Sequence, residues 1–269
     1  MIRLAIFIFF AATASAGAAP RVMSTDFCAD QFILKLADRE QIAALSPDAD
    51  NDFSYLRREA AGLPRTRPDA ESVVSYAPDV VLRFWGGDEA RLRALDLHVV
   101  TLKFANNFED VIENIRTAAA ALEKNTQGDA LIADMRDRLA ALASAAHTNP
   151  EALYVTPGGV TAGKGTMIDA ILNAAGVRNI AAEQGLSFWP PLPAEAVVAA
   201  PPALIVAGFF SANSERISHW SAARHPAFRK VFDQTPSIHL PTDVLSCPAW
   251  YSVDAAEIIA SAIRGDDAE

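Results

Sequence analysis

Hydrophobic and polar positions recur along this chain in two long segments that share one order. Residues 70–82, AESVVSYAPDVVL, align with residues 194–206, AEAVVAAPPALIV. Residues 33–44, ILKLADREQIAA, align with residues 171–182, ILNAAGVRNIAA. In the first pair, a short helical stretch ends at a proline and an apolar run follows, which is typical of a buried strand. Two matched segments in the same order indicate an internal duplication.

Strands alternate with helices in both halves, which favours parallel βαβ units. Between the halves, apolar residues at positions 131, 132, 135, 139 and 142 form a helical stripe. A helix of about 20 residues spans roughly 30 Å and makes a stiff connection. We therefore predict an α/β protein with two Rossmann-like lobes, each with a mostly parallel sheet, joined by one long rigid helix. The expected ranges are 19–126 for the first lobe, 127–148 for the helix and 149–269 for the second lobe.

The first 18 residues are typical of a secretory signal peptide. Arg3 precedes a short apolar run, and Ala14, Ser15 and Ala16 form a small-residue cleavage site. The run is shorter than the roughly 20 residues that a membrane anchor needs. We expect cleavage and export to the periplasm. The formal net charge of -10 disfavours nucleic acid as a partner.

The chain contains two cysteines, Cys28 and Cys247. In an oxidising compartment, such a pair is more often a disulfide than two free thiols. The alternative is a pair of thiols that line a site.

Aromatic residues gather at the predicted carboxyl ends of the strands and in the adjoining loops. Ligands of open α/β sheets bind beyond these ends, so aromatics from two lobes would hold a large, flat, partly apolar ligand. Any one of these aromatics could instead belong to the core. The predicted ligand-binding residues are Phe27, Tyr55, Phe84, Trp85, Phe104, Lys164, Trp189, Phe209 and Trp250.

The segment TPGGVTAGKGT, residues 156–166, resembles a phosphate-binding loop. Such a loop needs Ser or Thr after the lysine, but Gly165 follows Lys164. We expect no phosphate site there. We expect this glycine segment to form the rim of the second lobe, with backbone N–H groups near the ligand.

Other patterns give no catalytic residue and no metal site. Residues 48–52, DADND, lack the glycine and glutamate of a calcium loop. The five histidines are scattered, and no G-x-S-x-G is present. We therefore expect a protein that is not an enzyme and has no cofactor.

The order of these segments resembles the periplasmic substrate-binding proteins of ABC importers for vitamin B12, ferric siderophores and haem. The residues that carry the resemblance are the stretches RVMS, LADREQIAALS, LPRTRPDAESVVSYAPDVVLRFWGG and LRALDLHVVTL in the first half, and ILNAAGVRNIAA and FWPPLPAEAVVAAPPALIV in the second. It implies a soluble binding protein, which we expect to be a monomer, that delivers a small metal complex to a membrane permease and its ATPase. In the family, one exposed Glu on each lobe docks on permease arginines. The matching positions are Glu71 and Glu195.

Within that family, VVLRFWGGDEARLRAL and FWPP are most similar to the B12-binding members, so the resemblance implies a corrinoid ligand. The arginines at positions 57, 58, 65 and 67 keep a ferric siderophore as an alternative ligand. Haem-binding members of the family coordinate the iron with a Tyr or His. An exported enzyme that handles such a metal complex and an interaction protein without a small ligand are the other hypotheses. The cysteine pair is not general in the family, and a bridge between the lobes would restrain opening.

Overall fold

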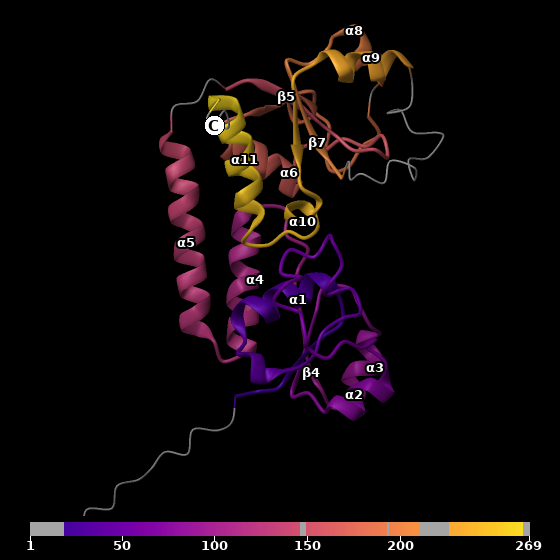
Figure 1. Cartoon of the computed structure of the whole chain (residues 1–269), viewed down its shortest axis with the longest axis vertical. Coiled ribbons are helices and arrows are strands. Elements are labelled where there is room, and N and C mark those ends of the chain that lie inside the picture. Colours follow the sequence, from indigo (N-terminus) through magenta and orange to yellow (C-terminus); the bar gives the residue numbers. More distant parts are fainter. Residues whose placement is uncertain (1–18, 146–148, 193, 210–225, 266–269) are drawn as a thin grey trace, which may run out of the picture.

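A computed structural model describes residues 19–145, 149–192, 194–209 and 226–265. The predicted signal peptide lies outside these residues. The molecule is elongated, with one α/β lobe at each end and the helices α4 and α5 beside them (Figure 1). Among the described residues, no helix combines the length and apolar character that crossing a bilayer requires.

The N-terminal lobe is built on a parallel four-stranded sheet in the order β2-β1-β3-β4. Its strands are β1 (Val22–Ser24), β2 (Ile42–Ala44), β3 (Val80–Arg83) and β4 (His98–Thr101). Its helices are α1 (Phe27–Leu36), η1 (Arg39–Gln41), α2 (Ala70–Tyr76) and α3 (Glu89–Arg93). β1 and β3 are fully buried, which fits their continuous apolar character.

The C-terminal lobe repeats this topology, with a parallel sheet in the order β6-β5-β7-β8. Its strands are β5 (Glu151–Val155), β6 (Arg178–Asn179), β7 (Leu204–Gly208) and β8 (Ser237–Leu240). Its helices are α6 (Met167–Ala174), α7 (Ile180–Glu183), α8 (Ala194–Ala199), α9 (Pro226–Gln234), α10 (Thr242–Leu245) and α11 (Ser252–Arg264). Two parallel α/β sheets with equivalent strand orders confirm the predicted fold class.

The duplicated segments differ at one point. Ile42–Ala44 form β2, whereas the matching residues of the second copy begin helix α7 (Ile180–Glu183). The side chain of Asn179 accepts a hydrogen bond from the backbone N–H of Ala181 and caps this helix. The cap ends the short strand β6 and starts a helix, so similar residues take different local structures.

Two antiparallel helices, α4 (Phe108–Ala121) and α5 (Asn125–Ser144), pack side by side along one side of the two lobes (Figure 1). A Cβ atom at Gly128 would lie 2.5 Å from the Cβ of Ala119, so the absence of a side chain lets the helices approach closely. α5 occupies the region expected for the joining helix. It is the segment of the chain that leads from one lobe to the other.

Asp30 fastens the ends of two strands to α1. Its buried carboxylate accepts hydrogen bonds from the hydroxyl of Ser24 and from the backbone N–H and hydroxyl of Ser46. Desolvation by burial raises the pKa of Asp30 from 3.8 to about 6, although the hydrogen bonds oppose this shift. The folded protein therefore holds this proton more tightly than the unfolded chain does.

This raised pKa predicts a pH dependence of stability. Wild-type protein should lose stability as pH rises from about 4 to about 6, because the unfolded chain has then released the Asp30 proton while the folded state still binds it. The variant Asp30→Asn lacks this proton. Its free energy of unfolding relative to wild type should therefore rise by up to about 3 kcal/mol across this range. Urea unfolding of both proteins at pH 4 and pH 7 checks this. A difference that stays constant with pH would contradict it.

Candidate functional site

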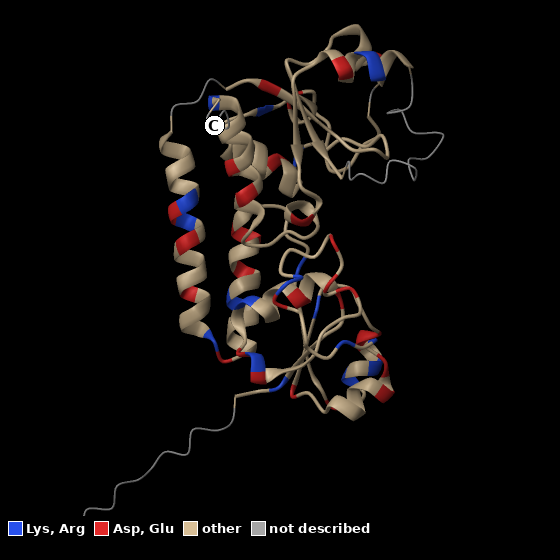
Figure 2. Ribbon diagram, in the orientation of Figure 1, with Lys and Arg blue, Asp and Glu red and all other residues tan. Residues whose placement is uncertain are grey.

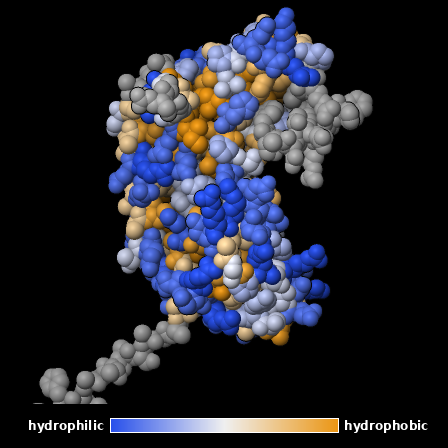
Figure 3. All heavy atoms as spheres, viewed as in Figure 1, coloured by the Kyte–Doolittle hydropathy of each residue, from blue (hydrophilic) through white to orange (hydrophobic). Residues whose placement is uncertain are grey.

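The carboxyl ends of both sheets face the contact between the lobes. In the N-terminal lobe, Cys28 lies at the start of α1, directly after β1, and forms a disulfide with Cys247 of the C-terminal lobe, with 5.6 Å between the Cα atoms. In the C-terminal lobe, α10 follows β8, and a Cβ added at Gly208 at the end of β7 would lie within 2.8 Å of Leu245 in α10. Arg57 of the first lobe pairs with Asp243 of α10 at 2.7 Å. The surface is hollowed beside this contact (Figure 3).

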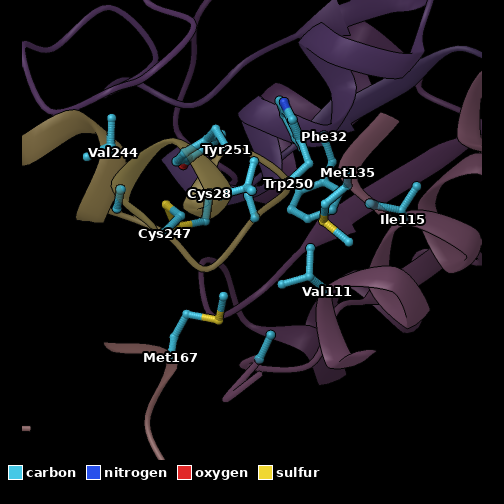
Figure 4. Close-up of a cluster of buried hydrophobic side chains, with 14 of the residues drawn as sticks. Cys28, Phe32, Val111, Ile115, Met135, Met167, Val244, Cys247, Trp250 and Tyr251 are labelled. Atoms are coloured by element: carbon cyan, nitrogen blue, oxygen red, sulfur yellow. A yellow bond between two sulfur atoms is a disulfide. The ribbon is translucent and has the colours of Figure 1, made fainter. Parts of the chain in front are cut away.

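An apolar cluster surrounds the disulfide (Figure 4). The rings of Phe32 and Trp250 meet edge to face with centroids 5.5 Å apart. Tyr55 stacks on Tyr251 at 4.0 Å and donates a hydrogen bond from its hydroxyl to Asp254. The segment that precedes α11 is thereby packed on α1. Trp250 and Tyr251 therefore pack against the N-terminal lobe, although they follow the sheet of the C-terminal lobe in the chain.

This packing corrects three of the predicted site residues. Trp250 is only 5% exposed and Phe84 is equally enclosed, so neither side chain reaches the hollow surface. Tyr55 is half-buried, and its hydroxyl and one ring face are occupied by Asp254 and Tyr251. Arg83, which also follows a strand, is buried as well. Each side chain lies at the expected edge, but its contacts turn it inward.

Trp85 is an exposed aromatic of the N-terminal lobe, with 48% of its surface accessible. Its ring meets Phe27 edge to face at 5.5 Å, and Phe27 in turn contacts Phe53 at 4.8 Å. These three rings, called here the first aromatic group, come from the turn after β3, from α1 and from the loop after β2. Phe104, which follows β4, is exposed too. Phe53 was not predicted, because it follows the acidic run DADND rather than a strand.

The second lobe presents Phe188 and Trp189, called here the second aromatic group, on the loop between α7 and α8. They are 64% and 44% exposed. The ring of Trp189 lies 6.3 Å from that of Tyr154 in β5. Phe209, at the end of β7, is also exposed. Phe188 was not among the predicted ligand-binding residues, although it is the first residue of the FWPP stretch that indicated a corrinoid.

The glycine segment of residues 156–166 holds the second aromatic group in place. The backbone N–H of Gly163 donates to the carbonyl of Phe188 at 2.8 Å, and that of Lys164 donates to Leu186 at 2.9 Å. A Cβ at Gly163 would collide with the backbone of Leu186, so this approach requires glycine. The expectation that these N–H groups face a ligand is therefore corrected for Gly163 and Lys164. The side chain of Lys164 is exposed on the same segment.

Iron-coordinating side chains are not presented at this edge by the described residues. Burial raises the pKa of Tyr55, Tyr154 and Tyr251 well above the ordinary range, so their phenolate forms are disfavoured. His98 opens β4, at the opposite end of the strand, and His239 lies within β8. The other histidines, at positions 147, 219 and 225, lie outside the described residues. In the described ranges, no group of three or more His, Cys, Asp or Glu is placed to hold a metal ion.

Glu71 and Glu195 occupy equivalent places in the two lobes. Each is exposed in the first turn of a short helix, α2 or α8, that precedes the central strand β3 or β7. The two helices lie at opposite ends of the molecule, one on each lobe (Figure 1).

Comparison with known proteins finds a matching family model and a curated relative. Residues 48–219 match the family model described as periplasmic binding protein. A cobalamin-binding protein of Halobacterium salinarum is 30% identical over 201 residues, which are 70% of this chain and 53% of the relative. The chain thus spans about half the length of that curated relative.

Solved structures show the same fold. The periplasmic haem-binding protein RhuT from Roseiflexus sp. RS-1 superposes with a TM-score of 0.69 at 23% identity, over 91% of this chain and 99% of that one. A periplasmic haem-binding protein from Pseudomonas aeruginosa gives a TM-score of 0.67 at 20% identity, over 91% and 92% of the two chains.

Proposed function

Because the chain belongs to the periplasmic binding protein family, we propose that it is the substrate-binding component of an ABC importer and captures a corrinoid between its lobes. The observation that carries this proposal is the pair of exposed aromatic groups at the carboxyl ends of the two sheets. Flat faces of this kind bind a large macrocycle through apolar contact and stacking, without a covalent or metal bond. The ligand is cargo and no chemical step is performed on it.

The choice of a corrinoid over haem has two supports. The first is the similarity to a relative named as a cobalamin-binding protein. The second is chemical: a pentacoordinate or hexacoordinate haem iron calls for a Tyr or His ligand. Burial raises the pKa of Tyr55 and Tyr251 at the lobe contact, which disfavours the phenolate form that binds iron. A corrinoid carries its own axial ligands, so aromatic surface alone suffices.

Delivery requires a permease with its ATPase, and we propose that Glu71 and Glu195 form the docking contacts. Both acids are exposed, and they occur at matching positions of a duplicated fold. Basic and acidic residues are interspersed over both lobes (Figure 2), so a matched pair of acids is a specific feature rather than part of a uniformly acidic face. In this role we propose that the protein acts in the periplasm as a monomer.

Truncation of either exposed tryptophan tests the ligand site. Trp85→Ala and Trp189→Ala should each weaken binding of cyanocobalamin about tenfold or more, because each removes a stacking face from one lobe. Trp250→Phe is the matched control. It changes a buried tryptophan and should leave the affinity within about twofold of wild type. Isothermal titration calorimetry measures all three. Equal losses in the three variants would show that the exposed rings have no special role.

A further inference from the structure

The carboxylate of Asp26 accepts more hydrogen bonds than the capping of a helix requires. Oδ1 accepts from the backbone N–H of Ala29 at 3.0 Å, which caps α1. Oδ2 accepts from three consecutive backbone N–H groups at the end of β3, those of Phe84, Trp85 and Gly86, at 2.8, 3.2 and 3.1 Å. The side chain is 5% exposed, so these bonds form out of contact with bulk water. One carboxylate thus ties the turn that carries Trp85 to the start of α1.

The carbonyl groups of the same turn are held by Arg83. Its Nε donates to the carbonyl of Gly86 at 3.0 Å, and one terminal nitrogen donates to that of Trp85 at 3.2 Å. Glu89 pairs with the same guanidinium and fixes its direction. A Cβ at Gly86 would collide with the backbone of Thr25, so the turn lies against the end of β1 as closely as backbone allows. An anion on one side and a cation on the other therefore immobilise the turn.

From this geometry we infer that Asp26 is a positioning residue for the ligand: it fixes the Trp85 turn in its binding conformation before the ligand arrives. This inference rests on the proposed function, because it takes Trp85 to be a ligand contact. Asp26 is buried beneath the turn and acts only through it. Because folding already orders three backbone residues of the turn, ligand binding does not carry the conformational entropy cost of ordering them.

The second aromatic group is immobilised in a different way. Its loop is paired to the glycine segment through backbone hydrogen bonds, which involve Gly163, Lys164 and Phe188. A change at Asp26 should therefore loosen only the first lobe. This asymmetry provides an internal control, because Trp189 reports on binding by a lobe that Asp26 does not touch.

The variant Asp26→Ser isolates the positioning role. A serine caps α1 as well as an aspartate does, but its hydroxyl is too short to reach the turn. Asp69→Ser is the matched control, since Asp69 caps α2 of the same lobe through Ser72 and no bond from it to another turn is described. Asp26→Asn provides a second variant that keeps the size of the side chain, but its amide nitrogen cannot accept a hydrogen bond.

A double-mutant cycle gives the first readout. Asp26→Ser should weaken cyanocobalamin binding about fivefold in wild type and in the Trp189→Ala background, and by less than about twofold in the Trp85→Ala background. Asp69→Ser should leave the affinity unchanged. A full fivefold loss without Trp85 would overturn the inference, because Asp26 would then act by another route.

Hydrogen exchange in the absence of ligand gives the second readout. The amides of Phe84, Trp85 and Gly86 should exchange about tenfold faster in Asp26→Ser and Asp26→Asn than in wild type, while those of the glycine segment stay unchanged. Unaltered exchange would overturn the inference, since the turn would then be rigid without Asp26. If wild-type protein fails to bind cyanocobalamin, the proposed function is wrong, and the exchange rates still decide whether Asp26 immobilises the turn.

Discussion

Charge reversal at both proposed docking acids, Glu71→Lys with Glu195→Lys, is expected to abolish ligand uptake and to leave ligand affinity unchanged. The two acids lie at matching places on α2 and α8, one on each lobe. If cationic residues of the permease pair with Glu71 and Glu195, each charge reversal replaces an attraction by a repulsion. The effects of the two reversals combine because both lobes must dock at once. The single variants should reduce uptake without abolishing it.

Uptake of labelled cyanocobalamin by cells that carry the permease measures this effect, and calorimetry on the isolated variant measures affinity. The matched control is Asp134→Lys with Asp137→Lys, which changes the net charge equally but on exposed positions of α5. That control should transport normally. A loss of affinity in the Glu71 and Glu195 variant would instead place these residues in the ligand site.

Removal of the disulfide is expected to be the most destabilising change that leaves the ligand surface intact. Cys28 and Cys247 are separated by 219 residues, so their bond restricts nearly the whole unfolded chain. Cys28→Ser with Cys247→Ser should lower the free energy of unfolding by roughly 3–5 kcal/mol. The bond also joins the lobes directly. Without it, the contact keeps the Tyr55–Tyr251 stack and the Arg57–Asp243 ion pair.

Chemical denaturation with and without reductant checks this prediction. Wild-type protein in dithiothreitol should approach the stability of the double variant, and the double variant should not respond to dithiothreitol. Mass spectrometry after alkylation gives an independent answer, since neither cysteine of unreduced wild type should react. Alkylation of both cysteines without reductant would show that they are free thiols.

The duplicated hydrophobic pattern was sufficient to predict two α/β lobes with parallel sheets, because strands that alternate with helices form parallel βαβ units. Local pattern was not sufficient to assign the direction of each aromatic side chain. Phe84 and Trp85 are neighbours in the turn after β3, but Phe84 is buried and Trp85 is exposed.

The remaining differences depend on contacts between distant parts of the chain. Trp250 is buried because α1 supplies Phe32, more than 200 residues earlier. The guanidinium of Arg83 donates hydrogen bonds to backbone carbonyl groups of the Trp85 turn. Every residue has a backbone carbonyl, so the amino-acid sequence does not indicate these contacts. The glycine segment was predicted to form a ligand rim because it lies between a strand and the N-terminus of a helix. Its glycines instead allow close contact between two loops.

The most direct test of corrinoid capture is a titration of wild-type protein, followed by tryptophan fluorescence, with cyanocobalamin, cobinamide, haemin and a ferric siderophore in parallel. The exposed rings of Trp85 and Trp189 should be quenched by a bound macrocycle that absorbs visible light. Corrinoid capture predicts saturable quenching by cyanocobalamin or cobinamide at micromolar concentration or below, with weaker or no response to haemin and the siderophore. A flat response to both corrinoids, with saturable quenching by haemin or the siderophore, would contradict it.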